Sequence, residues 1–101
     1  MLIAADRLND FVTAMLVRAG APEGKARICA DHLVAANLKG HDSHGVGMAS
    51  SYVRWMAAGK LHPEADAKVI HDHVAVLVVD GQFGLGQVVA RQAIDLAIER
   101  A

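Results

Sequence analysis

Cysteine, proline and aromatic residues are scarce in this sequence of 101 residues, which has one cysteine, two prolines and 4% aromatic residues. The single cysteine, Cys29, excludes an internal disulfide and is typical of proteins in a reducing compartment. The longest apolar run, residues 74–79, has the length of a strand and is far shorter than the ~20 residues of a membrane-spanning helix. No basic segment followed by an apolar run begins the chain, so we predict no secretory leader.

An excess of charge of one sign is also missing. The sequence has 10 lysines and arginines against 11 aspartates and glutamates, a net charge of −1. The isoelectric point is near 6.6, so no electrostatic argument favours binding to nucleic acid or to an anionic membrane. Hydrophobic residues reach 53%, above the ~45–50% of ordinary soluble domains. This excess indicates more apolar surface than the core of one small domain can cover.

The first part of the sequence carries apolar residues at helical spacing. We predict helices over residues 8–19, 22–39 and about 44–58, ended by the glycines that follow them. A linker with a proline follows the third helix, so residues 1–63 are predicted to form an N-terminal helical segment. The apolar face of the first helix is predicted to consist of Leu8, Phe11, Val12, Met15, Leu16 and Ala19.

The second part of the sequence is rich in β-branched residues. Residues 67–71 and 73–79 are predicted to form a hairpin that turns at Asp72, with its second strand covered on both faces. A last helix begins in the glycine-rich stretch that follows and has no exit signal at its end. A lone hairpin is marginal in water, so we expect the sequence to be the N-terminal piece of a longer chain. The predicted class is α+β, with residues 64–101 starting a larger β/α domain.

A short polar stretch, residues 40–45 (GHDSHG), separates the second and third predicted helices. Gly40 tolerates the backbone that ends a helix, and Asp42 or Ser43 can cap the next one. His44 then falls in the first turn of that helix, where open N–H groups favour an anion such as a carboxylate. An imidazole can give or take a proton near neutral pH. His44 is therefore either a general acid–base or a surface histidine, and the residues alone favour the surface histidine.

The neighbours of His44 have structural and functional interpretations. Ser43 could orient a substrate or cap the helix, and these two roles are compatible. A nucleophilic pair of Ser43 and His44 is not expected, because adjacent residues at a helix start point in different directions. Tyr52 is predicted to belong to the core with its hydroxyl at the edge. Trp55 and Met56 are predicted to be packing residues.

Metal and dinucleotide sites are weighed and not predicted. His41, Asp42 and His44 are metal-binding residue types, but the rest of the chain offers no convincing further ligand. Residues 81–87 (GQFGLGQ) follow a strand and open a helix, yet they lack the G-x-G-x-x-G spacing. A tight strand-to-helix turn is therefore favoured over a dinucleotide site.

Residues 37–48 (NLKGHDSHGVGM), at their place after two helices, resemble the N-terminal region of the type 2 malate/L-lactate dehydrogenase family. The D-S-H-G block is the most specific part of this resemblance. It extends in order over nearly the whole chain, continuing at Tyr52, Gly59, Pro63, Val79-Asp80-Gly81, Gly84, Gly86-Gln87 and Ala90.

The resemblance implies a cytoplasmic, homodimeric oxidoreductase that uses NAD or NADP to interconvert 2-oxo and 2-hydroxy acids. It implies a nucleotide-binding domain that is not a Rossmann fold, of which residues 64–101 would be the start. By the same resemblance His44 is the proton donor and Ser43 lines the substrate pocket, and we assign Tyr52 to substrate binding as well. Most cofactor contacts would lie beyond residue 101, so no cofactor-binding residue is named. No nucleic acid or membrane partner and no metal are expected.

One position departs from the family pattern. Many members carry an arginine four residues after the histidine, where it can hold a substrate carboxylate through a two-pronged ion pair. Here that residue is Met48, and the H-G-V-G-M form resembles the 2-hydroxycarboxylate dehydrogenase branch. Arg54 is a poor substitute, because at ~1.5 Å per residue it lies roughly 15 Å along the helix from His44.

A second interpretation belongs to another class of protein. The chain could be a catalytically inactive fragment that serves as a protein-interaction module, or a degenerate remnant, associating through uncovered apolar faces. Under either interpretation the isolated chain is expected to be inactive, because most of the nicotinamide site would be absent. Oxidation of NADH with a panel of 2-oxo acids tests that expectation.

Overall fold

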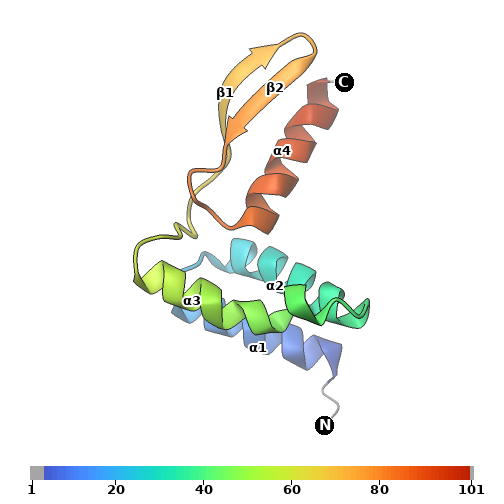
Figure 1. Cartoon of the computed structure of the whole chain (residues 1–101), viewed down its shortest axis with the longest axis vertical. Helices are drawn as coiled ribbons and strands as arrows, with labels where there is room; N and C mark the ends of the chain where they lie inside the picture. Colours follow the sequence, from blue (N-terminus) through green and yellow to red (C-terminus); the bar gives the residue numbers. More distant parts are fainter. Residues whose placement is uncertain (1–3, 101) are drawn as a thin grey trace.

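The computed structural model describes residues 4–100. Figure 1 shows the three N-terminal helices lying together as one layer, from which the hairpin and the last helix rise. The predicted α+β class is confirmed, and no helix within residues 4–100 has the length and apolarity needed to cross a membrane. The elements are α1 (Ala5–Arg18), α2 (Glu23–Leu38), 3₁₀ turns at Asp42–His44 and Val46–Met48, α3 (Ala49–Ala57), β1 (Lys68–His73), β2 (Val76–Asp80) and α4 (Gly86–Arg100).

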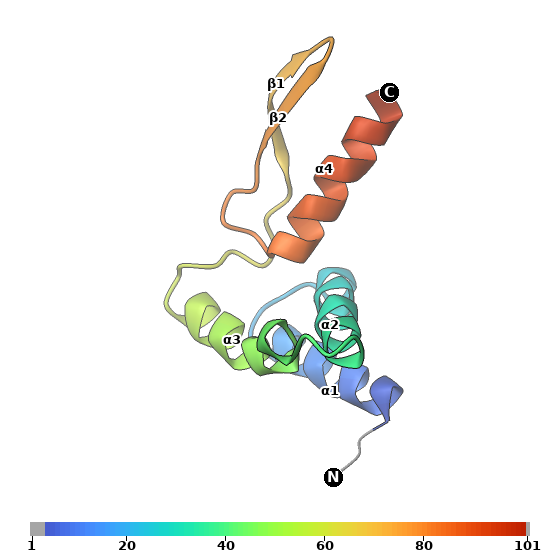
Figure 2. The same ribbon diagram turned by 45° about the vertical axis from the view of Figure 1, so that its right-hand side comes forward.

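The buried core lies where α2 meets α1, α3 and the start of α4. Figure 2 shows α4 beginning above α2, and buried side chains from both helices meet there. Several of the α2 residues are small, so the neighbouring helices approach this helix closely. The core includes Val12 and Leu16 of α1, Ala26, Cys29, Ala30 and Leu33 of α2, Ala49 of α3, and Leu85 and Val88 at the start of α4.

One member of the predicted apolar face of α1 does not reach the core. Phe11 is 67% exposed, whereas Val12 and Leu16 are almost fully buried. Successive residues of a helix are rotated by about 100°, so Phe11 falls at the edge of the stripe that faces the other helices. The prediction was wrong for Phe11 because the stripe that packs is narrower than the apolar pattern.

The third helix begins later than predicted. In place of an α-helix from His44, the chain makes two 3₁₀ turns, and α3 begins at Ala49. Neither Asp42 nor Ser43 caps a helix, because no side-chain cap bond is formed at the start of either turn or of α3. The two glycines at positions 45 and 47 disfavour a continuous helix. His44 therefore lies on a short 3₁₀ turn and not in the first turn of an α-helix, as the sequence suggested.

The hairpin reverses later than predicted. The antiparallel register pairs Asp72 with Leu77 and His73 with Val76, so the chain turns at residues 74–75 and not at Asp72. Asp72 belongs to β1, because the residue after it, His73, still pairs with β2. The stretch contains no glycine or asparagine that would mark the turn in the sequence.

The second strand is not covered on both faces within residues 4–100. Val76 and Val78 are 55% and 43% exposed, whereas Leu77 and Val79 are half-buried. The strand therefore has one protected and one open face, which corrects the prediction made from its continuous apolar run.

The stretch between β2 and α4 is a tight turn, as predicted. Gln82 and Phe83 have left-handed backbones, with φ of 53° and 59°. Gly81 and Gly84 serve close packing: a Cβ on Gly84 would lie 3.0 Å from the carbonyl oxygen of Ala65, whereas a Cβ on Gly86 would meet open space. At Gly81 and Gly84 the turn thus packs against its surroundings.

A polar cluster joins α2, the linker before β1, and α4. Lys25 of α2 forms an ion pair with Asp66 at 2.7 Å and donates a hydrogen bond to the carbonyl oxygen of Glu64 at 2.5 Å. Gln92 of α4 donates to Asp66 at 2.8 Å and accepts from the backbone N–H of Ala67 at 2.7 Å. These contacts hold the linker between the two helices at the point where the hairpin starts.

Candidate functional site

The DSHG turn (Asp42–Gly45) folds back against the end of α2. Gly40 has a left-handed backbone with φ of 83°, which ends the helix as predicted. The N–H of His41 then donates to the carbonyl oxygen of Ala36 at 2.8 Å, so the chain reverses at this point. The side chain of Asn37, in the last turn of α2, bonds to residues on both sides of Ser43 and His44.

Ser43 and His44 meet in this turn. The Ser43 hydroxyl oxygen lies 3.0 Å from Nδ1 of His44, and both residues are exposed. The prediction that the two side chains point apart was wrong, because they lie on a 3₁₀ turn and not at the start of an α-helix. When Nδ1 carries a proton, it donates to the Ser43 hydroxyl oxygen and leaves Nε2 as the nitrogen that exchanges a proton. The imidazolium form can then give the Nε2 proton to a ligand oxygen, and the neutral ring can take it back at Nε2.

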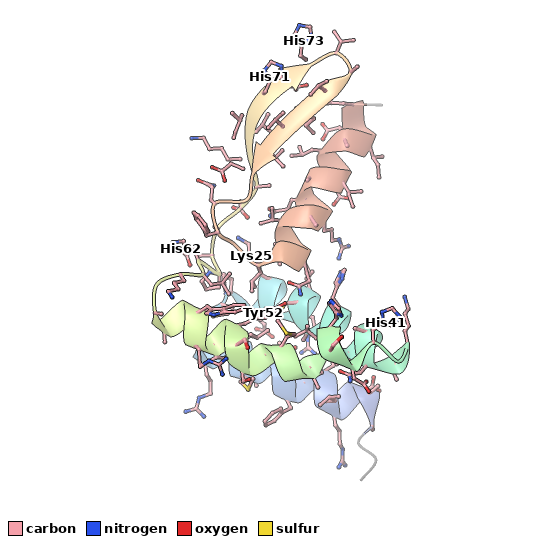
Figure 3. All side chains as sticks on the ribbon, in the orientation of Figure 1. Lys25, His41, Tyr52, His62, His71 and His73 are labelled. Carbon is pink, nitrogen blue, oxygen red and sulfur yellow. The ribbon has the colours of Figure 1, made fainter. Side chains whose placement is uncertain are left out.

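Apart from His41, the histidines labelled in Figure 3 lie away from this turn. Figure 3 shows His41 at the turn and His71 and His73 far away on the hairpin, where their rings stack 5.8 Å apart. Within residues 4–100, no three side chains of histidine, cysteine, aspartate or glutamate are grouped so that they could hold a metal ion.

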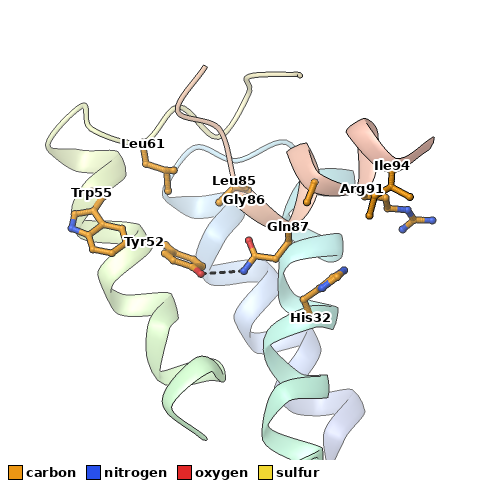
Figure 4. Close-up of a pocket in the computed structure, with 10 residues that line it drawn as sticks. His32, Tyr52, Trp55, Leu61, Leu85, Gly86, Gln87, Arg91 and Ile94 are labelled. Atoms are coloured by element: carbon orange, nitrogen blue, oxygen red, sulfur yellow. Dashed lines mark hydrogen bonds between the residues drawn. The ribbon is translucent and has the colours of Figure 1, made fainter. Parts of the chain in front are cut away.

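A cavity of about 720 Å³ opens between α2, α3 and α4 (Figure 4). Tyr52 and Trp55 of α3 line one side, with ring centroids 5.9 Å apart, and Leu85 lines another. Trp55, predicted to be a packing residue, lies against Tyr52 but is 41% exposed and lines the cavity, whereas Met56 packs against the core as predicted. The volume falls within the range of about 300–1,000 Å³ that is usual for small-molecule sites.

Gln87 connects the wall of this cavity to the core. Its Nε2 donates to the Tyr52 hydroxyl oxygen at 3.0 Å, and its Oε1 accepts from the thiol of Cys29 at 3.6 Å. Burial raises the pKa of the Cys29 thiol to about 12, so the thiol keeps the proton that it donates. The ring of Tyr52 packs against the core, and its hydroxyl lies at the cavity edge, as predicted.

The predicted site residues lie in two places. Ser43 and His44 adjoin one another on the DSHG turn, whereas Tyr52 lines a cavity whose described lining includes neither of them. Met48, at the position of the family arginine, is half-buried and packs against the core. Arg54 is exposed and donates to the Ser51 hydroxyl at 3.1 Å, so it does not line the cavity either.

Two residues of these sites were missed as functional candidates. Asn37 shares one side of α2 with apolar residues such as Ala30 and Leu33, and a polar residue among apolar neighbours was the signal that could have revealed its role. Gln87 gave no comparable signal, because its partners Cys29 and Tyr52 are 58 and 35 residues away in the sequence.

Several known proteins are similar to this chain in sequence or in fold. Hydroxycarboxylate dehydrogenase B of Escherichia coli (strain K12) is 44% identical over 97 residues, which are 96% of this chain and 27% of that protein. L-sulfolactate dehydrogenase of Methanocaldococcus jannaschii is 38% identical over 101 residues, or 100% of this chain and 29% of that protein. The structure of malate dehydrogenase from Pyrococcus horikoshii OT3 has a TM-score of 0.94 at 38% identity, covering 100% of this chain and 29% of that one.

The sequence and the fold are thus similar to those of proteins named as dehydrogenases of hydroxy acids, which are oxidoreductases. Residues 3–101 match the family described as malate/L-lactate dehydrogenase, and the chain belongs to that family. It matches the N-terminal part of the family and spans between a quarter and a third of the length of these relatives.

Proposed function

We propose that the protein carrying this sequence transfers a hydride between a nicotinamide cofactor and a 2-oxo or 2-hydroxy acid. Membership of the malate/L-lactate dehydrogenase family supports the reaction class, and the names of its relatives support the hydroxy-acid substrate. The observation that carries the proposal is the contact of 3.0 Å between Ser43 and His44 on an exposed turn.

In this proposal His44 holds the proton that is exchanged with the substrate oxygen. Ser43 supports it because its hydroxyl oxygen lies 3.0 Å from Nδ1 of the ring, and by the family resemblance Ser43 would also line the substrate pocket. Tyr52 binds the substrate through its hydroxyl. Because that oxygen already accepts from Gln87, its own O–H remains available to donate to a carbonyl or carboxylate oxygen.

The cofactor would be NAD or NADP and would supply or accept the hydride. Gly81 and Gly84 of the β2–α4 turn are packed closely against Val89 and Ala65, so these two glycines do not cradle a phosphate. We therefore assign no cofactor-binding residue. We propose instead that residues 1–63 are a helical segment and that residues 64–101 start the nucleotide-binding domain.

We also propose the cellular compartment, the oligomeric state and the substrate class from the family resemblance. The protein would act in the cytoplasm as a homodimer, with a small 2-oxo or 2-hydroxy acid as its substrate. A single cysteine and a balanced charge support that setting over an oxidising compartment or a nucleic-acid partner.

The substitution His44→Ala in the full-length enzyme tests this assignment. Loss of a general acid–base is expected to lower kcat by roughly 10²–10⁴. The measurement is the oxidation of NADH or NADPH with a panel of 2-oxo acids, together with circular dichroism to show that the fold is intact.

His41→Ala is the matched control, because His41 is an exposed histidine three positions earlier in the chain. It is expected to leave kcat within about twofold, as is usual for a surface substitution away from the chemistry. Equal rates for wild type and His44→Ala would remove His44 from the mechanism.

A further inference from the structure

The carboxamide of Asn37 bridges the DSHG turn from one side to the other. Its Oδ1 accepts a hydrogen bond from the backbone N–H of Val46 at 2.7 Å, and its Nδ2 donates to Oδ1 of Asp42 at 2.8 Å. Asp42 and Val46 flank Ser43, His44 and Gly45 in the sequence. A single side chain on a helix of 16 residues therefore ties down both ends of the segment that carries His44.

The chemistry of the two partners leaves one orientation for this carboxamide. A backbone N–H only donates, so it must face the carbonyl oxygen of Asn37. An ionised carboxylate only accepts, so Asp42 must face the amide nitrogen. If the oxygen and the nitrogen of the carboxamide exchanged places, both hydrogen bonds would be lost. The bridge thus has a defined direction.

Gly45 makes room for the bridge. A Cβ built on Gly45 would lie 2.0 Å from Oδ1 and 2.5 Å from Cγ of Asn37, closer than atoms in proteins approach one another. The backbone of Gly45 has φ of −95°, which any residue can adopt, so the need for glycine at this position is one of space. The glycine of the D-S-H-G block is thereby explained by its contact with Asn37.

The turn needs such external support. The 3₁₀ segment at Asp42–His44 has three residues. Within it, the N–H of His44 donates to the carbonyl oxygen of His41, and the N–H of Gly45 donates to that of Asp42. Short 3₁₀ turns have poor hydrogen-bond geometry. Misplacing a reactive group by about 1 Å can lower a rate by about 100-fold, so the position of the imidazole matters to the reaction.

We propose that Asn37 is a positioning residue for His44: its carboxamide holds the DSHG turn so that the Ser43–His44 pair keeps one geometry and one ring tautomer. This inference rests on the proposed function of His44. Asn37 touches neither the imidazole nor the Ser43 hydroxyl and acts only through the backbone and Asp42.

The substitution Asn37→Asp in the full-length enzyme tests the proposal. The variant keeps the size of the side chain and the acceptor for Val46, but it places a carboxylate against Asp42 in place of the donor. We expect kcat to fall about tenfold with little change in KM. The nitrogen NMR shifts of the His44 ring are expected to change from values typical of one tautomer to values averaged over both tautomers.

The double variant Asn37→Asp/Asp42→Asn exchanges donor and acceptor and restores the bond. We expect it to recover kcat to within about threefold of wild type, since the geometry of the turn is regained. Asn9→Asp is the matched control, because Asn9 also donates its amide to an aspartate, Asp31, between two helices and far along the chain from the turn. That control is expected to change thermal stability and to leave kcat and the His44 tautomer unchanged.

The outcomes separate this inference from the proposed function. If His44→Ala abolishes turnover but Asn37→Asp lowers only the melting temperature, Asn37 is a structural residue and the inference is overturned. If His44→Ala has no effect on turnover, the function assigned to His44 fails, while the ring NMR still decides whether Asn37 positions it. Should Asn37→Asp not fold, Asp42→Ala removes the same hydrogen bond and is expected to give the same fall in kcat.

Discussion

Cys29 shows how burial controls the chemistry of one residue. Its side chain is completely buried where α2 meets the start of α4, and its thiol donates to Gln87. Burial in an apolar surrounding disfavours the thiolate, and the pKa is accordingly raised from 9.0 to about 12. Because the thiolate is the reactive form, this cysteine supports the packing and the Gln87–Tyr52 hydrogen bond and is not available for redox chemistry.

The reactivity of Cys29 is therefore expected to be very low in the folded protein. In mildly alkaline buffer, a disulfide reagent such as DTNB is predicted to react on the order of 100-fold more slowly than in concentrated urea. Stability is expected to decrease as the pH rises above the ordinary pKa of 9.0, because the unfolded thiol then loses its proton while the folded one keeps it. Rapid reaction of the folded chain would contradict the burial described here.

At the scale of elements, the linker before β1 is held by charge and hydrogen bonds. Lys25 and Gln92 approach Asp66 from α2 and α4, and the hydrogen bond from Lys25 is the main cause that lowers the pKa of the Asp66 carboxyl below 3.8. A lowered pKa in the folded state means that the deprotonated carboxylate stabilises the fold. Asp66 is exposed to solvent, which screens the ion pair and keeps its contribution small.

Asp66→Asn is expected to lower the melting temperature by a few degrees near neutral pH and to have less effect in acid. The stabilisation from the carboxylate is present above 3.8, the ordinary pKa, and is lost as the pH falls through the lower pKa of the folded state. Asp95→Asn, which changes an exposed carboxylate on α4, is the control and should change little at any pH. A difference between wild type and Asp66→Asn that stayed constant into acid would argue against the ion pair.

The molecule as a whole leaves much apolar surface open on the hairpin and α4. Val76, Ile94 and Ile98 are 55%, 58% and 67% exposed. Apolar surface of this extent normally marks a contact with more protein. The relatives in which this fold occurs are more than three times as long as the chain, so they have ample further residues to supply that contact.

The isolated chain of 101 residues is predicted to show no oxidation of NADH or NADPH with 2-oxo acids. It carries the proposed proton donor, but it spans only 27% of the length of a dehydrogenase relative, and Gly81 and Gly84 of its glycine-rich turn are closely packed. The full-length enzyme, assayed beside it, is expected to be active. Clear turnover by the isolated chain would show that these residues are self-sufficient.

Much of this protein is encoded in short stretches of sequence. Helical spacing and the glycines after each helix determined α1 and α2, and a run of β-branched residues determined a hairpin followed by a helix. The D-S-H-G block after two helices was enough to identify the family. These features depend on neighbouring residues, because backbone preferences and hydrophobic periodicity act over a few positions.

Other features were decided only when the helices packed. Asn37 reaches across to Val46, and Gln87 reaches Tyr52, because α2, α3 and α4 meet in space and not in sequence. The Asn37 side chain also bonds to both sides of the 3₁₀ turn in which Ser43 lies 3.0 Å from the His44 ring. Hydrogen bonds between distant side chains depend on the relative placement of whole elements, and local preferences carry no information on that placement.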